Sequence, residues 1–456
     1  MRLALLFECG AFFIAAVACS GGSNRQNVSG SGGAPESGGA SSEGGSTTSG
    51  GASSEGGSNA SGGDTSSVGG VSSVDGGTTT SIDGSTLDGS AQSTVKSLTA
   101  GVSHVCALLN DGSIRCWGND YNSQLGDIPA ADCCNAKNKC ICNSTPVEVS
   151  SITNAVSVAA GGNHVCVGLS DGSMECWGYN YDGQLGNGST TDSPNPVAVS
   201  NVSNVVSVAG GGLHTCALLS DGSIQCWGYN YNGQLGNGTF ATYSLMPGAV
   251  IGITDAIEIT AGEFHTCAVL KSGSVNCWGD NTYAQLGDGT TTRSSLPQPV
   301  VGVSNAVSVA GGYGHSCALL ADKTLQCWGY NSRSQLGNPS ASTGTVPIPV
   351  AVIGVSDAIA VAAGRFHTCA ALGSGAVQCW GNSDVGQLGT GDTVTATVAA
   401  TVSGITDAVD IKVGDYVSCA LLRSGVVRCW GDDSSGQLGD GISTGYNPVP
   451  VTVSGL

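Results

Sequence analysis

Seven tryptophans at equivalent positions constrain the fold of this chain more than any other feature. Every Trp is preceded by Cys and followed by Gly, a second Cys lies ten positions before the first, and a Gln-Leu-Gly follows. Successive tryptophans are 50 to 52 residues apart, except for a first interval of 60. The chain therefore contains seven copies of one unit of about 50 residues, with an insertion in the first. The tryptophans are Trp117, Trp177, Trp227, Trp278, Trp328, Trp380 and Trp430.

The two cysteines of each unit flank a predicted β-hairpin. In the second unit, Cys166 and Cys176 enclose two short strand-like runs around an Asp-Gly dipeptide, which is typical of a tight turn. If these cysteines face each other, residues 170–172 form a three-residue loop closed by Gly172 at positive φ. In the fifth unit Lys323 occupies this glycine position, where we expect backbone strain.

Two further strands complete each unit. An apolar strand such as 155–162 precedes the hairpin, and a Pro-flanked strand such as 299–301 precedes that strand. Four strands repeated seven times predict an all-β, seven-bladed β-propeller. The C-terminal run 448–454 resembles the Pro-flanked strand but has no unit after it, so we expect it to complete the first blade and close the ring.

The paired cysteines predict seven disulfides within blades, because opposed residues of neighbouring strands lie within disulfide range. A zinc site would need cysteine pairs two to four residues apart, assembled in fours, and the repeat does not supply them. Disulfides indicate export to an oxidising compartment. The predicted pairs are Cys106 with Cys116, Cys166 with Cys176, Cys216 with Cys226, Cys267 with Cys277, Cys317 with Cys327, Cys369 with Cys379, and Cys419 with Cys429.

All six histidines lie two positions before the first cysteine of a unit, and Val417 takes this place in the seventh. A residue repeated six times is not typical of a catalytic group, and side chains from separate blades are poorly placed to share one metal ion. We therefore expect these histidines to hold blade corners through hydrogen bonds, and the tryptophans to pack between blades. The histidines are His104, His164, His214, His265, His315 and His367.

The insertion in the first unit spans 127–145 and is the least repeat-like part of the predicted propeller. We expect its four cysteines to pair as 133 with 140 and 134 with 142, or as 133 with 142 and 134 with 140, and a zinc knuckle is the alternative. A stiffened loop on a rigid scaffold is a candidate contact surface, although it can equally be decoration. The candidate residues are Cys133, Cys134, Cys140, Cys142, Lys137 and Lys139.

The N-terminus predicts export. A short basic start is followed by an apolar stretch from Leu3 to Ala18 that only Glu8 interrupts. The small residues before Cys19 resemble a bacterial lipobox, although Ala16 stands where that motif usually has Leu. The resemblance implies a signal peptide over 1–19, lipidation at Cys19, and an exported protein at the outer membrane or cell surface of a Gram-negative-type bacterium. Cleavage near Ala18 without a lipid is the alternative.

Residues 20–95 predict a disordered linker. Of these 76 residues, 21 are Gly and 21 are Ser, and no apolar periodicity is present. Such a composition cannot bury enough apolar surface to fold. We expect the linker to carry the propeller, residues 96–456, clear of a membrane.

The units closely resemble the regulator of chromosome condensation repeat. The second unit shows this pattern as Gly161-Gly162-Asn163-His164, Asp171-Gly172, Trp177-Gly178-Tyr179-Asn180 and Gln184-Leu185-Gly186. The resemblance covers about 96 to 456 and implies a seven-bladed propeller. It does not fix a function, because one fold serves unrelated tasks.

Charge and motif content favour a binding module. The whole chain carries a net charge of −19, and residues 96–456 carry 12 basic and 25 acidic residues, hence −13, which disfavours nucleic acid as a partner. We expect a non-catalytic domain that binds a protein or polysaccharide at the cell surface, with no cofactor, no metal and no catalytic residue. The alternatives are guanine-nucleotide exchange, as in the namesake of the repeat, and a glycan lyase or hydrolase. The last would need a non-repeated acid/base cluster.

Overall fold

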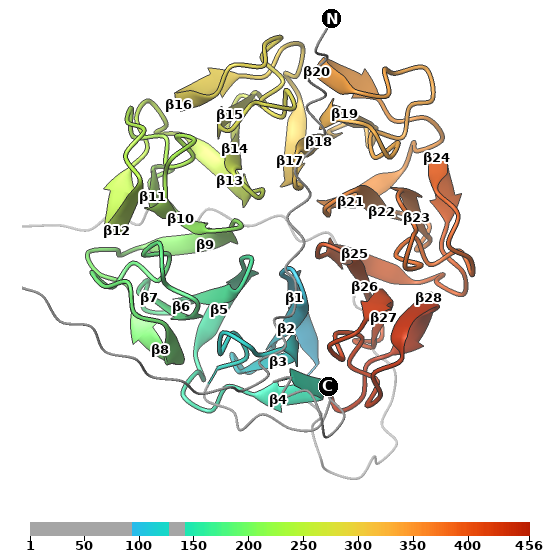
Figure 1. Cartoon of the computed structure of the whole chain (residues 1–456), viewed down its shortest axis with the longest axis horizontal. Helices are drawn as coiled ribbons and strands as arrows, with labels where there is room; N and C mark the ends of the chain where they lie inside the picture. The colour runs from blue at the N-terminus through green and yellow to red at the C-terminus, as the bar shows by residue number, and fades with distance from the viewer. Residues whose placement is uncertain (1–93, 127–141) are drawn as a thin grey trace, which may run out of the picture. The chain divides into compact units, whose positions relative to one another are not determined.

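The described residues form a ring of seven antiparallel sheets of four strands each (Figure 1). The structure is a computed structural model that describes residues 94–126 and 142–456. Between these bounds no α-helix is present, which confirms the predicted all-β, seven-bladed propeller. The predicted signal peptide, Cys19 and the linker up to residue 93 lie outside the described residues.

Each blade consists of four strands that are consecutive in the chain. The first three blades comprise β1 (Val95–Ala100), β2 (His104–Leu109), β3 (Ile114–Asn119) and β4 (Cys142–Glu148); β5 (Ala155–Ala160), β6 (His164–Leu169), β7 (Met174–Gly178) and β8 (Ser193–Ala198); and β9 (Val205–Gly210), β10 (His214–Leu219), β11 (Ile224–Tyr229) and β12 (Tyr243–Ala249).

The remaining blades follow the same order. They comprise β13 (Ala256–Ala261), β14 (His265–Leu270), β15 (Val275–Gly279) and β16 (Ser294–Pro299); β17 (Ala306–Gly311), β18 (His315–Leu320), β19 (Leu325–Tyr330) and β20 (Thr345–Ala351); β21 (Ala358–Ala363), β22 (His367–Leu372), β23 (Val377–Gly381) and β24 (Ala396–Thr401); and β25 (Ala408–Val413), β26 (Val417–Leu422), β27 (Val427–Asp433) and β28 (Gly445–Thr452). The first strand of each blade is innermost in Figure 1.

The hairpin register agrees with the sequence prediction. Cys166 lies opposite Cys176 in the β6–β7 pair, and a disulfide joins them with their Cα atoms 4.1 Å apart. The amide of Gly172 donates to the carbonyl oxygen of Leu169 at 2.9 Å, and Gly172 has the expected positive φ of 82°. Lys323, which replaces this glycine in the fifth blade, also adopts a positive φ of 67°, where an L-residue is strained.

The prediction that the C-terminal strand completes the first blade is wrong. Strand β28 pairs with β27 inside the last blade, and the first blade has its own fourth strand, β4, which pairs with β3. The Pro-flanked strand of every unit thus belongs to the blade that precedes it in the chain, although its connection to the next blade is the shorter one: 14 residues separate β7 from β8, and six separate β8 from β9. Strand β4 was not predicted from the sequence, because it begins at Cys142, inside the segment that we assigned to the insertion.

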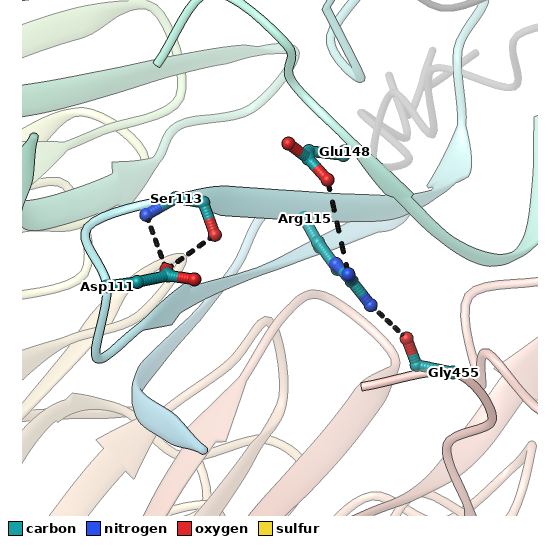
Figure 2. A network of polar contacts seen from close by, with 5 residues as sticks. All are labelled: Asp111, Ser113, Arg115, Glu148 and Gly455. Carbon is teal, nitrogen blue, oxygen red and sulfur yellow. Dashed lines mark hydrogen bonds and ion pairs between the residues drawn. The ribbon is translucent and has the colours of Figure 1, made fainter. Parts of the chain in front are cut away.

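Contacts between the first and last blades close the ring in place of a shared strand. Figure 2 shows Arg115 of β3 between Glu148 of its own blade and the chain end, where its guanidinium donates to the carbonyl oxygen of Gly455. Behind this contact, Trp117 packs into one buried cluster with Cys419 and Cys429 of the last blade. Closure therefore rests on side-chain packing and hydrogen bonds across the junction.

The same packing recurs at every junction between blades. Seven buried clusters are present among the described residues, and each combines the disulfide of one blade with the tryptophan of the next. The disulfide-bonded hairpin cysteines and the indole rings are buried. The apolar core of the molecule is thus divided among the junctions, and no blade has a core of its own.

Each indole also makes a hydrogen bond across its junction. Trp227 Nε1 donates to the backbone oxygen of Gln184 in the preceding blade at 2.9 Å, and Trp117 donates in the same way to Gln437, at 3.0 Å across the closing junction. The glycine of the Gln-Leu-Gly allows this approach at six of the seven junctions. A Cβ atom on Gly186 would lie 2.6 Å from Trp227 Nε1.

The histidines hold the junctions as the sequence predicts. His164 Nε2 lies 2.8 Å from Thr215 Oγ1 of the next blade, and Thr215 in turn donates to the backbone oxygen of Gln184 at 2.8 Å. Burial lowers the pKa of His164 to about 3, so the ring stays neutral at physiological pH. Four further junctions repeat this chain of hydrogen bonds.

Two junctions depart from this pattern in different ways. Between the seventh and first blades both positions are apolar, since Val417 replaces the histidine and Val105 replaces the hydroxyl residue. Between the first and second blades only the hydroxyl is lost. Val165 faces the fully buried His104, neither ring nitrogen of which has a hydrogen-bond partner among the described residues. An unpaired buried polar group of this kind costs about 1–3 kcal/mol.

Restoring the hydroxyl should therefore stabilise the propeller. We expect Val165→Thr to raise the free energy of unfolding by about 1 kcal/mol, because Thr is close in shape to Val and its hydroxyl can bond both His104 and the backbone oxygen of Gln124. Equilibrium denaturation under non-reducing conditions measures this change. Val105→Thr is the matched control, since no histidine faces it, and it should give no gain. Equal effects of both substitutions would contradict the role assigned to His104.

Candidate functional site

One face of the propeller carries the loops that vary between blades. Because neighbouring strands are antiparallel, the loop from the first to the second strand and the loop from the third to the fourth strand leave the same edge of each blade. We call this side the loop face. The short loops from the first strand surround the central channel, and we call them the rim loops: residues 101–103, 161–163, 211–213, 262–264, 312–314, 364–366 and 414–416.

The middle position of the rim loops breaks the sevenfold pattern. The first three blades carry small or apolar residues there, whereas the other four carry charged or aromatic ones. In blade order these residues are Val102, Gly162, Gly212, Glu263, Tyr313, Arg365 and Asp415. The backbone at these positions still follows the repeat, since Glu263 N donates to Gly312 O at 3.2 Å much as Gly162 N donates to Gly211 O at 3.0 Å. The difference between blades is therefore confined to side chains.

Arg365 and Asp415 form an ion pair at the rim. Arg365 Nη1 lies 2.9 Å from Asp415 Oδ2, and the guanidinium carbon lies 4.7 Å from the centroid of the Tyr313 ring and 5.9 Å from that of Tyr416. Burial raises the pKa of Asp415, and the adjacent guanidinium opposes that rise. Both the carboxylate and the aromatic rings thus hold this arginine in place.

Glu263 lies on the other side of the rim. Its carboxyl group extends over Gly212, where an added Cβ atom would lie 2.6 Å from Glu263 Cδ. Burial raises the pKa of Glu263 to about 7, the charge on Asp415 contributes to this rise, and Arg365 opposes it. Glu263 is therefore partly protonated at neutral pH, unlike an ordinary surface carboxylate.

Below the rim, the channel encloses a cavity of about 320 Å³. Much of its wall is glycine backbone from the rim loops, and its charged lining residues include Glu258 and Lys412. Glu258 accepts a hydrogen bond from Ser308 Oγ at 2.8 Å, while Lys412 Nζ pairs with Asp410 at 2.9 Å. Burial raises the pKa of Glu258. The cavity is polar and holds more acidic than basic groups.

Half-buried aromatic rings extend from the rim across four neighbouring blades. Tyr283 lies 4.5 Å from Tyr330, which lies 6.1 Å from Phe366, measured between ring centroids. Gly314 makes room for this packing, because a Cβ atom there would lie 2.9 Å from Tyr283 Cδ2. Tyr229 and Phe264 continue the group at 6.0 Å. Aromatic residues gathered on one face in this way are typical of binding surfaces.

Exposed tyrosines add to this face in the first three blades. Tyr121, Tyr181 and Tyr231 occupy equivalent positions in the loops after the third strands and are 73%, 69% and 55% exposed. In the third blade, the Arg293 guanidinium lies 5.1 Å from the centroid of the Tyr231 ring. The loop face thus presents aromatic side chains around most of its circumference.

The seven disulfides predicted within the hairpins are all present in the structure. Each pair lies between the second and third strands of its blade, with the Cα atoms 4.1 Å apart. All seven therefore lie inside the junction clusters, away from the loop face. The bonded pairs are Cys106 with Cys116, Cys166 with Cys176, Cys216 with Cys226, Cys267 with Cys277, Cys317 with Cys327, Cys369 with Cys379, and Cys419 with Cys429.

Of the candidate residues in the insertion, only Cys142 lies within the described residues. Cys142 at the start of β4 is disulfide-bonded, and its partner lies outside the described residues. The bond favours the disulfide interpretation of this cysteine over the zinc knuckle. The remaining insertion candidates lie outside the described residues as well: Cys133, Cys134, Cys140, Lys137 and Lys139.

The part of the chain that the structure describes shows neither a metal-binding group nor a membrane-spanning helix. In residues 94–126 and 142–456, no three His, Cys, Asp or Glu side chains are grouped so as to hold a metal ion. Nor is any helix in these ranges long and apolar enough to cross a bilayer.

Sequence reasoning missed the rim residues Glu263, Tyr313, Arg365 and Asp415. Aligning the seven units shows that the position two before each histidine, or before Val417, changes from blade to blade. The non-repeated cluster that the sequence analysis required of an active site is present at this position. Chemically, it offers one partly protonated carboxyl group, one ion pair and a polar cavity.

Comparison with protein families gives the fold a name. The RCC1-like domain family matches residues 176–456, more than half of the 456 residues, and the regulator of chromosome condensation (RCC1) repeat matches 95–124, 155–184 and 111–167. The chain belongs to the RCC1-like domain family. This RCC1-like propeller therefore shares its repeat with proteins of several functions, and its ligand has to be inferred from its own loops.

Curated relatives match only parts of the chain. Protein pim1 of Schizosaccharomyces pombe is 33% identical over 102 residues, which are 22% of this chain and 19% of pim1. The ultraviolet-B receptor UVR8 of Arabidopsis thaliana is 30% identical over 201 residues, which are 43% of this chain and 32% of the receptor. The match thus spans about a third or less of the length of these relatives.

Solved structures share the propeller at low sequence identity. Human WBSCR16 superimposes with a TM-score of 0.67 at 22% identity, covering 75% of this chain and 94% of that one. Yeast RCC1 (Prp20), in a crystal structure with Kap60 bound, superimposes with a TM-score of 0.64 at 20% identity, covering 80% and 86%. These likenesses show the fold alone.

The raised pKa of Glu263 predicts a pH-dependent stability. Since the folded chain binds the Glu263 proton more tightly than the unfolded chain, the free energy of unfolding should fall as pH rises from about 4.5 to about 7. Glu263→Gln cannot ionise and should escape this loss. We expect its denaturation midpoint to match that of the wild type at pH 4 and to exceed it at pH 8.

Glu148→Gln is the control for this measurement, because Glu148 is exposed on the outer strand β4 and its ion pair with Arg115 is long, at 4.0 Å, and solvent-exposed, so it contributes little to stability. It should shift the midpoint little at either pH. A Glu263→Gln variant that is no more stable than wild type at pH 8 would show that the Glu263 carboxyl group is well solvated.

Proposed function

We propose that this RCC1-like propeller is an extracytoplasmic, lipid-anchored and non-catalytic binding module that holds a protein or polysaccharide ligand on its loop face. The observation that carries the proposal is the broken symmetry of the rim, where Glu263, Tyr313, Arg365 and Asp415 differ from the small residues of the first three blades. Residues needed for blade packing recur in nearly every unit. Residues that vary while the backbone stays constant are free to serve a ligand.

Export is supported by two separate features. The N-terminal sequence resembles a lipoprotein signal ending at Cys19, and every blade carries a buried disulfide. Disulfides of this number are rare in reducing compartments. A tether of low-complexity sequence after a lipidated cysteine would let the propeller reach ligands away from the membrane surface.

A glycan lyase or hydrolase is the second candidate, favoured by the pKa of Glu263 near 7, which suits a general acid or base. Hydrolysis of a glycoside normally uses two carboxyl groups. Of the other carboxyl groups at the cavity, Asp415 is engaged by Arg365 at 2.9 Å, and Glu258 accepts a hydrogen bond from Ser308 Oγ at 2.8 Å. Guanine-nucleotide exchange, the activity of the namesake of the repeat, is the other alternative. Release of reducing sugars or unsaturated products from cell-surface glycans would favour the enzyme, and accelerated nucleotide release from a small GTPase would favour exchange.

Lipid anchoring predicts a simple fractionation result. We expect the wild-type chain in the membrane fraction of the producing bacterium and Cys19→Ala in the soluble exported fraction, because the thiol that carries the lipid is lost. Ser23→Ala leaves that thiol in place and should stay with the membrane. Immunoblotting of the two fractions measures the distribution. If Cys19→Ala remained with the membrane, the lipoprotein proposal would be wrong.

Binding on the loop face predicts that aromatic substitutions there reduce ligand capture. We expect the oxidised Cys19→Ala chain to retain specific components of a cell-surface extract, and Tyr231→Ala combined with Tyr283→Ala to retain them at least tenfold less. Truncating aromatic anchors at a binding surface often costs about 2 kcal/mol or more. Quantitative mass spectrometry of the retained material measures this difference.

Val301→Ala combined with Ile353→Ala provides the matched control. These exposed apolar residues lie between the fourth strand of one blade and the first of the next, on the side opposite the loop face. Capture by this control should equal that of the parent chain. Loss of capture by the control, with the loop-face variant unaffected, would place the binding surface on the other side.

A further inference from the structure

The central cavity carries an excess of negative charge, and the two carboxyl groups that cause it belong to the fourth blade. Lys412 pairs with Asp410 at 2.9 Å, and Arg365 pairs with Asp415 at 2.9 Å, so both cations are engaged. Glu258 and Glu263, both from the fourth blade, form no ion pair within residues 94–126 and 142–456. Glu258 accepts a hydrogen bond from Ser308, whereas the Glu263 carboxyl group makes none within the same ranges.

Glu258 stands where most other blades have small residues, and Glu263 stands at a position that varies from blade to blade. Five of the six residues equivalent to Glu258 are Ser or Ala, and two of those equivalent to Glu263 are Gly. Gly212 is needed for the observed position of Glu263, because any side chain there would collide with its carboxyl group. Glu258 and Glu263 are half-buried beside an open cavity of about 320 Å³, and the two cations that act on them, Lys412 and Arg365, are already paired with aspartates. The site therefore carries an excess of negative charge.

The aromatic rings at the rim suit the same kind of ligand. Ring faces attract ammonium and guanidinium groups, and this protein already uses that interaction twice on the loop face. Arg365 lies 4.7 Å from the Tyr313 centroid, and Arg293 lies 4.7 Å from the Phe240 centroid. Tyr313 occupies the same position of its rim loop as Glu263 does in the preceding blade, so aromatic and acidic groups lie together at the rim.

We propose that the mouth of the channel binds the ammonium or guanidinium group of a lysine or arginine side chain presented by a protein partner, with Glu263 and Glu258 as its counter-charges. This inference rests on the proposed binding function and narrows its ligand. The net charge of −13 over residues 96–456 favours the approach of a basic partner to the whole propeller.

A polysaccharide fits the same surface less well. The hydroxyl groups of a neutral sugar can donate hydrogen bonds to carboxylates, but they cannot balance two negative charges, and sugars stack best on rings that lie flat and parallel. Here the Tyr283 and Tyr330 rings are inclined by 47° and the Tyr330 and Phe366 rings by 54°, so each ring partly covers the next. The cavity volume of about 320 Å³ suits one extended side chain.

Binding of a cation should release a proton. In the empty site Glu263 has a pKa of about 7 and faces Asp415, Arg365 and Tyr313 across the rim, with Glu258 and Lys412 below it. A cation held by Glu263 would lower that pKa. At pH 7 we therefore expect about half a proton to be released for each ligand bound, and the affinity to fall as pH drops below 7.

The test uses a decalysine peptide as the probe and the oxidised Cys19→Ala chain at physiological salt. Isothermal titration calorimetry in two buffers of different ionisation enthalpy gives both the affinity and the number of protons released. We expect Glu263→Gln to weaken binding about tenfold, as loss of one charge-assisted contact would, and to abolish proton release. Glu258→Gln should weaken binding and leave part of the proton release.

Glu148→Gln changes the net charge by the same amount on the outer strand β4 and should retain both the affinity and the proton release. A thermal melt of each variant checks that the fold is kept. If Glu263→Gln and Glu148→Gln weakened the affinity for decalysine equally, and neither variant released protons on binding, the binding would be non-specific electrostatic attraction. This result would overturn the inference.

Two other outcomes would also overturn it, and they separate it from the proposed function. If laminarihexaose binds and Glu263→Gln abolishes that binding while decalysine does not bind, the site recognises a polysaccharide. If neither probe binds, yet capture of cell-surface components still depends on Tyr231 and Tyr283, the binding module stands and the channel is not its site.

Discussion

The hydrogen bond from each indole to the preceding blade is the constraint on which the ring depends. At all seven junctions, Trp Nε1 donates to the backbone oxygen of the Gln in the previous Gln-Leu-Gly, at 2.9 to 3.1 Å. The donor comes from one blade, and both the acceptor and the glycine that admits the indole come from the Gln-Leu-Gly of the preceding blade, so the bond forms only when two units meet in one register. Because the same bond links Trp117 to Gln437, the last junction has the same geometry as the other six.

This bond also explains why so much of each unit recurs. The acceptor oxygen takes a second hydrogen bond from a Thr or Ser hydroxyl at five junctions, and that hydroxyl is the partner of the buried histidine. The disulfide of one blade packs against the indole of the next, so Cys, Trp, Gln, Gly and His serve one interface. A unit of this kind cannot bury its apolar face alone, and closure of the ring supplies the last partner. Rim side chains take no part in these contacts and can change without disturbing them.

The sequence predicted what depends on spacing within one unit. The hairpin register follows from two cysteines ten residues apart with an Asp-Gly turn between them, and the roles of the histidines and tryptophans follow from their recurrence. It failed for the C-terminal strand, because repeated units show which strands exist but not whether the Pro-flanked strand joins the blade before it or after it. The rim cluster was also missed. Glu263 and Asp415 are far apart in the sequence, and only the ring brings the two to one channel.

The sevenfold axis makes the channel sensitive to single substitutions. Rim loops from all seven blades surround a common cavity, so a change of one rim side chain alters the charge of the site. An unbroken repeat would place seven identical groups around the axis, and seven charges of one sign would repel one another too strongly to stay ionised. A specific site on this scaffold therefore requires broken symmetry, with small residues on one side leaving room for large ones on the other. In this propeller the small residues at the rim are Gly162 and Gly212, and the charged residues that line the same cavity are Glu263 and Asp415. Proteins that share the junctions between blades can therefore differ entirely in what they bind.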